Sequence, residues 1–482
     1  LAASCYLAQQ GHSVTIYEKN TTIGGRARQL KKDGFTFDIG PTWYWMPDVF
    51  ERFFADFGKK PSDYYELIKL SPAYQVYFGV KDFVTIADNL PEIIETFEAI
   101  ENGSGKKLAS FMKEAQSNYD IAIKDLVYRP GVSPLELVTI ETAKKVNQFF
   151  GNISKDIRRR FTNTKLIQIL EFPVLFLGAK PSDTPSFYSF MNFADFGLGT
   201  WHPDKGMYAI VKAMVAVAKE LGVTFNTNSP VESIHVENGR ATGITTNGKN
   251  IQGDFVLSGA DYHHIETALL PAAAQSYSAA YWDSRVMAPS CLIYYIGLNK
   301  KLVGAQHHTL FFDTSFEVHG AEIYTTKSWP TDPLFYMSVT SVTDTSAAPE
   351  GHENIFLLMP VATGLAGDTE DVREKYLDQM LTRIEKRLGQ SVKDAIVYKR
   401  SFAQSDFISD YHAFKGNAYG LANTLLQTAI LKPSCRSKKV KNLFYTGQLT
   451  VPGPGVPPSL ISGEVVAGQV VKHYSTNKNK QL

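Results

Sequence analysis

The sequence predicts an α/β protein whose first forty residues complete a Rossmann-like dinucleotide-binding unit. Residues 1–11 are rich in small side chains and end on Gly11, as expected for a helix. Residues 12–18 have the β-branched and aromatic composition of a short strand, which ends on Glu18. In a dinucleotide-binding βαβ unit, an acidic residue about 20 positions after a glycine-rich turn binds the ribose hydroxyls. We therefore predict that Glu18 is this carboxylate.

The chain begins at Leu1, without the first strand and the glycine-rich turn of such a unit. We expect the sequence to be an amino-terminal truncation, with that turn immediately before Leu1. The amides of the turn and the N-terminus of the following helix would hold a pyrophosphate. Whether a targeting segment precedes Leu1 stays open.

Two glycine-containing turns follow the strand. The pair Gly24-Gly25 lets the backbone pass close to a ligand, and the adjacent Arg26 can offset phosphate charge. Gly40 and Thr42 belong to a second turn, of the form Asp-x-Gly-Pro-Thr. This ordered set resembles the flavoproteins with two dinucleotide-binding folds, which bind FAD. The alternative is an ordinary crossover with a turn and a surface arginine.

Composition narrows the classes of function. The 482 residues are enough for two or three domains, and 49 Lys and Arg nearly balance 48 Asp and Glu, so no nucleic-acid partner is expected. The three cysteines are far apart, so we predict neither a disulfide framework nor a metal site, and a cytoplasmic location. The sequence contains no run of about 18 apolar residues, so we predict no membrane-spanning helix.

Helical and strand patterns divide the chain into three predicted parts. The dinucleotide-binding part is discontinuous and comprises residues 1–72, 201–280 and 431–475. Strand patterns at 73–78, 83–86, 291–296 and 355–359 predict a sheet-based substrate domain over 73–90 and 281–430. Its helix is predicted at 372–388, before Gly389. Residues 91–200 have mostly helical spacing and are predicted to be an insertion.

The middle of the chain adds two expected cofactor contacts. Residues 223–255 are predicted to form short strands with Asn-Gly hairpin turns at 238–239 and 247–248. We predict that Val231, in this stretch, contacts the cofactor. Residues 254–261 form an apolar strand that reaches Gly259. The carboxyl end of such a strand is where an α/β sheet presents its backbone to a ligand. The alternative is a buried strand followed by a turn.

The closing motif gives the sharpest signal. A strand at 442–447 ends on Gly447, a loop rich in proline and glycine follows, and a helix with small residues is predicted from 461. A loop with few side chains lets amides approach a flat ring, and a helix N-terminus stabilises the negative charge of a reduced flavin. We predict that Gly447, Gly455 and Val456 contact the cofactor. The alternative is a proline-rich surface loop.

Taken over the whole chain, these motifs resemble the bacterial phytoene desaturase family, carotenoid-forming flavoproteins related to the amine oxidases. The resemblance rests on the opening helix and on residues 38–47, 202–206, 416–420 with Gln427, and 447–457. Three residues depart from the family pattern. Leu449, Val451 and Pro458 stand where glycine, histidine and glycine are common, which affects the expected ring contacts more than the fold.

The resemblance implies a Rossmann-like, two-dinucleotide-binding FAD fold with an inserted mixed-sheet substrate domain and a helical subdomain that contacts the membrane. It also implies that non-covalent FAD desaturates phytoene towards lycopene. Hydride leaves an allylic C–H for the flavin, and a proton leaves the neighbouring carbon. Oxygen or a quinone is the expected electron acceptor. Trp43, Tyr44 and Trp45 are predicted to line the substrate tunnel, with ordinary core packing as the alternative, and the catalytic residues stay unassigned.

Membrane contact has a separate signal in the helical part. Three arginines at 158–160 precede an apolar run at 173–177, and basic residues beside apolar helical faces can dock on lipid. The alternative is a solvated face or a set of internal ion pairs. Because an apolar polyene is stored in lipid, we expect peripheral membrane association. The oligomeric state is left open.

Three other functions compete with phytoene desaturation. A related carotenoid desaturase or saturase acting on a hydroxylated or shorter polyene would share nearly every motif. A flavin amine oxidase is the second, although residues 447–450 lack the acidic and histidine residues common in those enzymes. The third is a redox-inactive flavoprotein that only binds a polyene. In every case, we expect Glu18 and Gly447 to share one cofactor cleft.

Overall fold

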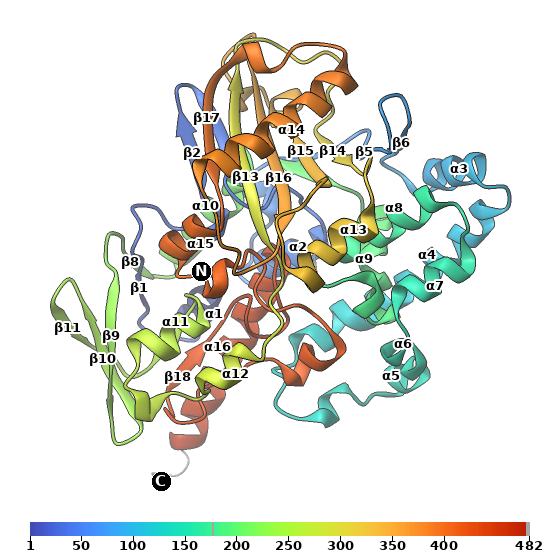
Figure 1. The fold of residues 1–482 in the computed structure, drawn as a ribbon. Helices are drawn as coiled ribbons and strands as arrows, with labels where there is room; N and C mark the ends of the chain where they lie inside the picture. Colours follow the sequence, from blue (N-terminus) through green and yellow to red (C-terminus); the bar gives the residue numbers. More distant parts are fainter. Residues whose placement is uncertain (176–177, 479–482) are drawn as a thin grey trace.

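The computed structural model describes residues 1–175 and 178–478 (Figure 1). Two pairs of parallel strands connect the opening and the closing parts of the chain to its middle. Helix α1 (Ala2–Gln9) leads to β1 (Thr15–Tyr17), which pairs with β8 (Thr224–Asn226). Strand β12 (Val256–Ser258) pairs with β18 (Leu443–Tyr445). Parallel pairs require crossover connections, so the predicted α/β class is confirmed. Both α1 and β1 are shorter than the predicted ranges.

The two ends of the chain meet through helix packing. Helix α16 (Val456–Lys478) lies against α1, and a Cβ atom placed on Gly463 would come within 2.5 Å of the Ala2 side chain. Only glycine permits this approach, because any larger residue would push the helices apart. The helix begins at Val456 rather than at the predicted residue 461. Pro457 and Pro458 are compatible with its first turn, where backbone N–H groups have no helical partner.

A seven-stranded mixed sheet forms a second part, seen at the top of Figure 1. Its order is β17 (Ile396–Phe402), β13 (Ser290–Leu298), β16 (Glu353–Val361), β15 (Phe335–Ser338), β14 (His308–Phe311), β5 (Tyr74–Tyr77) and β6 (Phe83–Ile86). Helix α14 (Glu370–Leu388) packs Tyr376, Met380 and Ile384 against it and ends at Gly389, whose φ is +65°. Residues 74–86 therefore do join this sheet, as predicted, whereas β14, β15 and β17 were not predicted.

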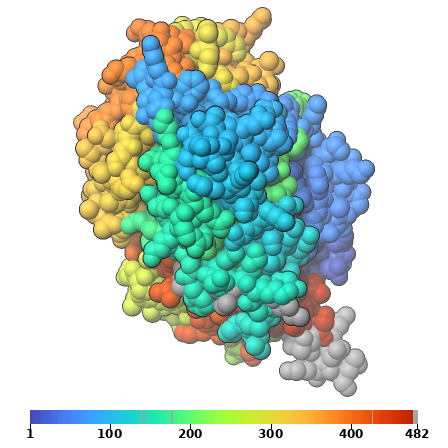
Figure 2. Space-filling model, turned by 90° about the vertical axis from the view of Figure 1, so that its right-hand side faces the viewer, coloured from blue at the N-terminus to red at the C-terminus, as the bar shows by residue number. Residues whose placement is uncertain are grey.

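The helical part covers the face shown in Figure 2, in cyan and green. Its chain turns between α3 and α4 and again after α4, where Asn-Gly and Pro-Gly signals predict breaks. The helices are α3 (Leu90–Ile100), α4 (Ser104–Lys124), α5 (Ile140–Lys144), α6 (Val146–Phe150), α7 (Ile153–Arg160), α8 (Thr164–Leu175) and α9 (Phe190–Asn192). Residues 176 and 177, the end of the predicted apolar run, lie outside the described residues. The boundaries between the three parts stay a prediction.

A three-stranded antiparallel sheet projects from the dinucleotide-binding part. It consists of β9 (Val231–Glu237), β10 (Arg240–Thr246) and β11 (Lys249–Gln252). Both connecting turns are the predicted Asn-Gly pairs, with φ values of 50° and 71° at Asn238 and Gly239. Positive φ at both positions is the geometry that tight hairpins require.

Two strand pairs were missed because each strand is short. They are β2 (Gln29–Lys32) with β3 (Phe35–Asp38), and β4 (Leu67–Lys69) with β7 (Trp201–Pro203). Residues 201–207 have the composition of a loop, but the first three form β7, because pairing with a strand more than 130 positions earlier is a tertiary effect. The remaining helices are α2 (Pro47–Ala55), α10 (Tyr208–Glu220), α11 (Tyr262–His264), α12 (Ala279–Asp283), α13 (Phe316–Ala321) and α15 (Gln404–Tyr411).

The three arginines at 158–160 form ion pairs on the protein surface. Arg158 bridges Glu171, Arg159 bridges Asp156, and Arg160 bridges both Glu114 and Asp156. In the described part of the apolar stretch that follows, Pro173 and Val174 are buried. This pairing favours the ion-pair alternative for the arginine run, and docking of the run on lipid stays a prediction. Among the described residues, the structure contains no helix with the length and apolar character needed to cross a bilayer.

Candidate functional site

Two of the sequence motifs meet at the start of helix α10. The Asp38 carboxylate accepts hydrogen bonds from the amides of Met207 at 2.7 Å and Tyr208 at 3.2 Å. A Cβ on Gly206 would lie 2.7 Å from this carboxylate, and φ at Gly206 is +88°, so glycine is required there. Burial raises the pKa of Asp38 to about 6, although the hydrogen bonds from the two amides act to lower it. The junction fixes the turn that carries Gly40 and Thr42.

The two glycine turns are in direct contact with each other. A Cβ on Gly40 would come within 2.1 Å of the Arg26 carbonyl oxygen, so the two backbones touch. Gly24 has a φ of +126° and packs on Tyr208 and Val211 of α10. No heavy atom lies within 4 Å of a Cβ placed on Gly25, which leaves that backbone open to a ligand. The structure therefore brings Gly24, Gly25, Arg26 and Gly40 together, as the predicted site requires.

Arg26 is half-buried, and one nitrogen of its guanidinium is buried without a hydrogen-bond partner among the described residues. Its guanidinium lies over the rings of Tyr411 at 4.7 Å and Phe407 at 5.3 Å. Nη1 is buried and has no hydrogen-bond partner in the described part of the chain. Burial lowers the pKa of Arg26, and the neighbouring Asp261 offsets this only in part. A buried cation is normally paired, so this arrangement is fitted to an anionic or hydrogen-bond-accepting ligand.

The parallel strands β12 and β18 place Gly259 beside Thr446, which precedes Gly447. A Cβ on Gly259 would touch the Thr446 methyl group at 3.6 Å, and the Gly447 amide donates to the Ser462 hydroxyl at 3.1 Å. Gly447 has a φ of +108° and no heavy atom within 4 Å of its Cβ position. Gly455 also has a positive φ, directly before Val456 opens α16. These residues form an exposed backbone edge at a helix N-terminus.

The expected cleft between Glu18 and Gly447 stays a prediction. Ser462, which binds Gly447, adjoins Gly463, and Gly463 touches α1, so the closing loop lies near the opening helix. Glu18 follows β1, and its Oε1 accepts from the backbone and side chain of Asn20. Val231 begins β9 and is half-buried against the core of that part. Ribose binding by Glu18 and cofactor contact by Val231 are likewise untested.

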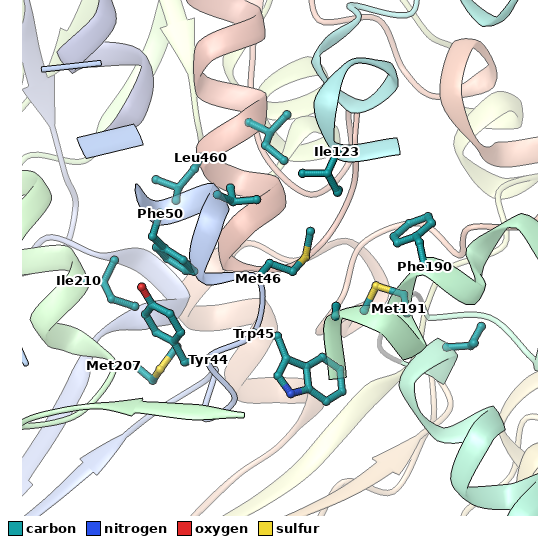
Figure 3. Close-up of a cluster of buried hydrophobic side chains, with 14 of the residues drawn as sticks. Tyr44, Trp45, Met46, Phe50, Ile123, Phe190, Met191, Met207, Ile210 and Leu460 are labelled. Carbon is teal, nitrogen blue, oxygen red and sulfur yellow. The ribbon is translucent and has the colours of Figure 1, made fainter. Parts of the chain in front are cut away.

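The aromatic motif at 43–45 enters the protein core. Tyr44 stacks on Phe50 at 4.3 Å and shares a hydrogen bond with the Tyr65 hydroxyl, and Figure 3 shows it beside Met207 and Ile210. Trp45 donates its Nε1–H to Thr200 at 2.8 Å. Both side chains are less than one-tenth exposed. This packing favours the core alternative for Tyr44 and Trp45, while a substrate contact from this motif stays a prediction.

Trp43 differs from its neighbours because it faces a buried polar network. Its ring stacks on His308 at a centroid distance of 4.0 Å. His308 Nδ1 lies 2.6 Å from the Tyr336 hydroxyl, which lies 2.9 Å from the Thr42 hydroxyl. Burial and the nearby His202 keep the pKa of His308 well below its ordinary range, so the imidazole is neutral. The sequence did not reveal His308 or Tyr336, since both lie in strands that were not predicted.

A second unpaired cation lies against the closing loop. Lys432 is 6% exposed, and its Nζ has no hydrogen-bond partner among residues 1–175 and 178–478. Both Lys432 Nζ and the Asn423 carboxamide lie within 3.6 Å of a Cβ placed on Gly453. Burial lowers the pKa of Lys432 to about 7. No pattern in the sequence marked this lysine, because its burial depends on two loops that are joined only in three dimensions.

These features test whether an FAD molecule suits the site. FAD has an anionic pyrophosphate and a ring edge that accepts hydrogen bonds. The chain offers two basic side chains with buried, unmet donor atoms, Arg26 Nη1 and Lys432 Nζ, and open backbone at Gly25 and Gly447. Donors without protein partners and backbone without side chains are what such a ligand needs. The residues present therefore fit FAD.

Comparison with known proteins places the chain in a family. The model of the flavin containing amine oxidoreductases matches residues 1–471. A carotenoid 3,4-desaturase from Haloarcula japonica is 40% identical over 475 residues, covering 98% of this chain and 96% of the relative. A 4,4'-diapophytoene desaturase (4,4'-diaponeurosporene-forming) from Staphylococcus aureus is 33% identical over 486 residues, with coverage of 98% and 96%.

Solved structures agree on the fold. An oxidoreductase from Methanosarcina mazei superposes with a TM-score of 0.65 at 17% identity, covering 98% of this chain and 97% of the other. Putrescine oxidase superposes with a TM-score of 0.62 at 12% identity, with coverage of 98% and 96%. At such identities the likeness concerns the fold alone. With the sequence relatives, it establishes that the chain belongs to the flavin containing amine oxidoreductases, within their carotenoid desaturase group, as an oxidoreductase whose cofactor is FAD.

Proposed function

We propose that this protein desaturates a carotenoid by removing two hydrogens from neighbouring carbons next to a conjugated system. The observation that carries the proposal is the aromatic wall of Trp43, Tyr336 and His308, which adjoins Thr42 and the glycine turns. Such a wall suits an apolar, unsaturated chain. Carotenoid desaturation by relatives at 40% and 33% identity over nearly the whole chain supports the same activity.

Bound FAD would supply the hydride acceptor. Arg26 and the open backbone at Gly25 and Gly447 would hold and orient it, and Lys432 would face it from the closing loop. The aromatic wall excludes water from the reacting carbons. His308 is neutral and is held in place by Tyr336 and Trp43. It is the basic group of the network that includes Thr42. We therefore propose that His308 accepts the proton lost from the neighbouring carbon.

For the specific step, we propose desaturation of phytoene towards lycopene, which the sequence resemblance implies. The second candidate is introduction of a 3,4 double bond into a preformed carotenoid, which the name of the Haloarcula relative favours. Oxygen or a quinone would reoxidise the flavin.

The test uses purified protein with FAD and liposomes that contain either phytoene or a carotenoid with a saturated 3,4 bond. Formation of coloured product from phytoene, followed by absorbance, is the expected result. Intact phytoene together with a red shift of the second substrate would replace the first candidate by the second. Conversion of neither substrate, with peroxide release from amines, would overturn carotenoid desaturation.

We further propose peripheral membrane contact by a cytoplasmic protein, through a surface other than the arginine run. Ala429 and Ile430 lie 3.5 Å from a Cβ placed on Gly131, so the segments around residues 131 and 430 are neighbours. Five large apolar side chains in residues 132–150 and at 426 are 68–77% exposed: Val132, Leu135, Val138, Phe150 and Leu426. We call these five residues the apolar patch. Exposed apolar patches of this kind are typical of protein or lipid contacts. Replacing Leu135 and Leu426 by serine is expected to weaken flotation with liposomes, and unchanged flotation would contradict the proposal.

A further inference from the structure

Lys432 and Asn423 present a buried donor and a buried acceptor to the same point of the closing loop. Lys432 Nζ and Asn423 Oδ1 have no hydrogen-bond partner anywhere in the described chain, and the two residues are 6% and 2% exposed. A Cβ placed on Gly453 would lie 3.4 Å from the amine and 3.6 Å from the carboxamide oxygen. We call these two residues the Gly453 pair. Burying both groups without partners is unfavourable, so the pair is suited to a ligand that supplies the partners.

The sequence motif at 416–420, together with Gln427, holds this pair in place. Within the motif, Asn417 accepts a hydrogen bond at 2.9 Å from the side chain of Gln448, at the start of the closing loop. Gln427 lies between the two members of the pair in the sequence. Its side chain accepts from the Val286 N–H at 2.9 Å and donates to the Val286 carbonyl at 2.8 Å. Because the segment is anchored at both places, the two unmet groups are a fixed feature of the fold.

The two unmet groups have opposite hydrogen-bonding character, which restricts the part of FAD that can satisfy both. A lysine ammonium only donates, and a carboxamide oxygen only accepts. The pyrophosphate offers acceptors alone, so it would satisfy Lys432 but not Asn423. The pyrimidine edge of the flavin ring has a carbonyl, an N–H and a second carbonyl in succession, so it supplies an acceptor beside a donor. The adenine edge also has one acceptor and one donor.

The helix that follows the closing loop distinguishes the flavin from the adenine. Helix α16 begins at Val456, three residues after Gly453, and its N-terminus is the positive end of the helix dipole. Reduction of a flavin places negative charge on the pyrimidine part of its ring, whereas adenine stays neutral. A lysine close to a helix N-terminus is suited to stabilising such a charge in a site that excludes water.

We infer that the Gly453 pair binds the pyrimidine edge of the flavin, with Lys432 stabilising the reduced, anionic ring and Asn423 accepting the hydrogen bond of its N3–H. This inference deepens the proposed placement of FAD and rests on it. Because Lys432 favours the reduced form over the oxidised form, it is expected to raise the reduction potential of the bound flavin. The pair is therefore tested on the flavin itself, without a polyene.

Redox titration of the FAD-loaded protein tests the role of Lys432. In K432M, reduced FAD is expected to lose about tenfold in affinity relative to oxidised FAD, which lowers the two-electron potential by about 30 mV. Absorbance of the reduced flavin is expected to show that its N1 takes up a proton at a pH about one unit higher than in the wild type. K432R returns the cation and should keep both values, as should K386M, at an exposed lysine of α14. Equal potentials in K432M and the wild type would overturn the inference.

A second measurement tests Asn423 and does not depend on the lysine variants. FAD methylated at N3 lacks the ring N–H, so the wild type is expected to bind it about three- to tenfold more weakly than FAD. N423A is expected to bind the two flavins equally. The adenine alternative is tested with ADP, whose affinity for K432M and N423A is expected to match that for the wild type. Weaker ADP binding by these variants, or the same preference for FAD in N423A as in the wild type, would overturn the inference.

These measurements separate the inference from the proposed function, because all of them are made at equilibrium and without a polyene. If the flavin depends on the Gly453 pair as expected and the protein converts no carotenoid, the proposed desaturation fails and the assignment of the pair stands. Carotenoid conversion together with an unchanged flavin potential in K432M would have the opposite meaning.

Discussion

Two arginines, the buried Arg373 and the half-buried Arg26, have opposite surroundings. Arg373, in the sheet-based part, bonds both oxygens of Asp368 at 2.7 and 2.9 Å and also reaches Asp406 at 2.9 Å. Arg26, at the junction of the glycine turns, has aromatic rings beside it and an Nη1 atom that has no partner in the described chain. Lys432 Nζ, like Arg26 Nη1, has no hydrogen-bond partner among the described residues.

This difference distinguishes charged side chains that stabilise the fold from charged side chains that are available to bind a ligand. A buried ion without a partner is strongly unfavourable, so a folded protein retains one only where another molecule supplies the partner. Each pair of variants below makes this contrast measurable.

The largest expected effect is on the paired arginine. Arg373→Met leaves the Asp368 carboxylate without its cation, and removal of one partner of a buried pair lowers stability by about 3–5 kcal/mol. Urea unfolding measures the loss. FAD affinity of the folded protein is expected to stay unchanged, and a parallel loss of FAD would show that the two regions are not independent.

The helix contact between the chain ends comes next. In Gly463→Val the new side chain collides with Ala2 and the backbone of Ala3, and overpacking of this kind lowers stability by about 1–3 kcal/mol. Gly468→Val is the matched control, because no atom lies within 4 Å of a Cβ at that position on the same helix. Equal unfolding midpoints for the two variants would refute the close contact.

For Arg26, the expected change in stability has the opposite sign to that for Arg373. Arg26→Gln removes a guanidinium whose buried Nη1 has no hydrogen-bond partner among the described residues, so the stability of the apoprotein is expected to hold or rise. FAD affinity is expected to fall about ten- to a hundredfold, through loss of a charge-assisted bond. Fluorescence titration measures it. Arg28→Gln, at a neighbouring arginine paired with Asp410, is the control and should change FAD affinity less.

For a single step of one pH unit, the smallest effect concerns Lys432. The folded pKa of Lys432 is about 7, below its ordinary 10.5, so between these values only the unfolded state takes up the proton. Stability of the apoprotein is therefore expected to rise with pH across this window, with a contribution from this lysine of about 1.4 kcal/mol per pH unit. Lys432→Met should remove that contribution, whereas Lys386→Met, at an exposed lysine, should retain it. Identical pH slopes in urea unfolding would contradict the burial of this charge.

Much of the fold could be predicted because its signals are local. Helix α14 ends at Gly389, and the β9–β10–β11 turns are Asn-Gly pairs, each of which acts through the conformation of one or two residues. Strands β4 and β7 carry no such signal, since three residues acquire strand geometry only by pairing across the fold. The same limit applied to the arginine run, where the partners Glu114 and Glu171 are remote in sequence.

The site divides in the same way. Glycines 24, 25, 40 and 447 could be selected from the sequence, because a backbone that must approach a ligand or adopt positive φ requires glycine wherever it lies. The roles of side chains could not. Tyr44 and Trp43 are adjacent in the chain, yet one packs in the core and the other stacks on His308.

The sequence by itself determined the family, the FAD cofactor and the backbone elements that would hold it, because local conformation is encoded by neighbouring residues. Tertiary structure alone decided which charges find partners. Burial and pairing depend on segments that meet only after folding, and for this reason the burial of Lys432 and the contacts of Tyr336 are found in the structure and not from any motif.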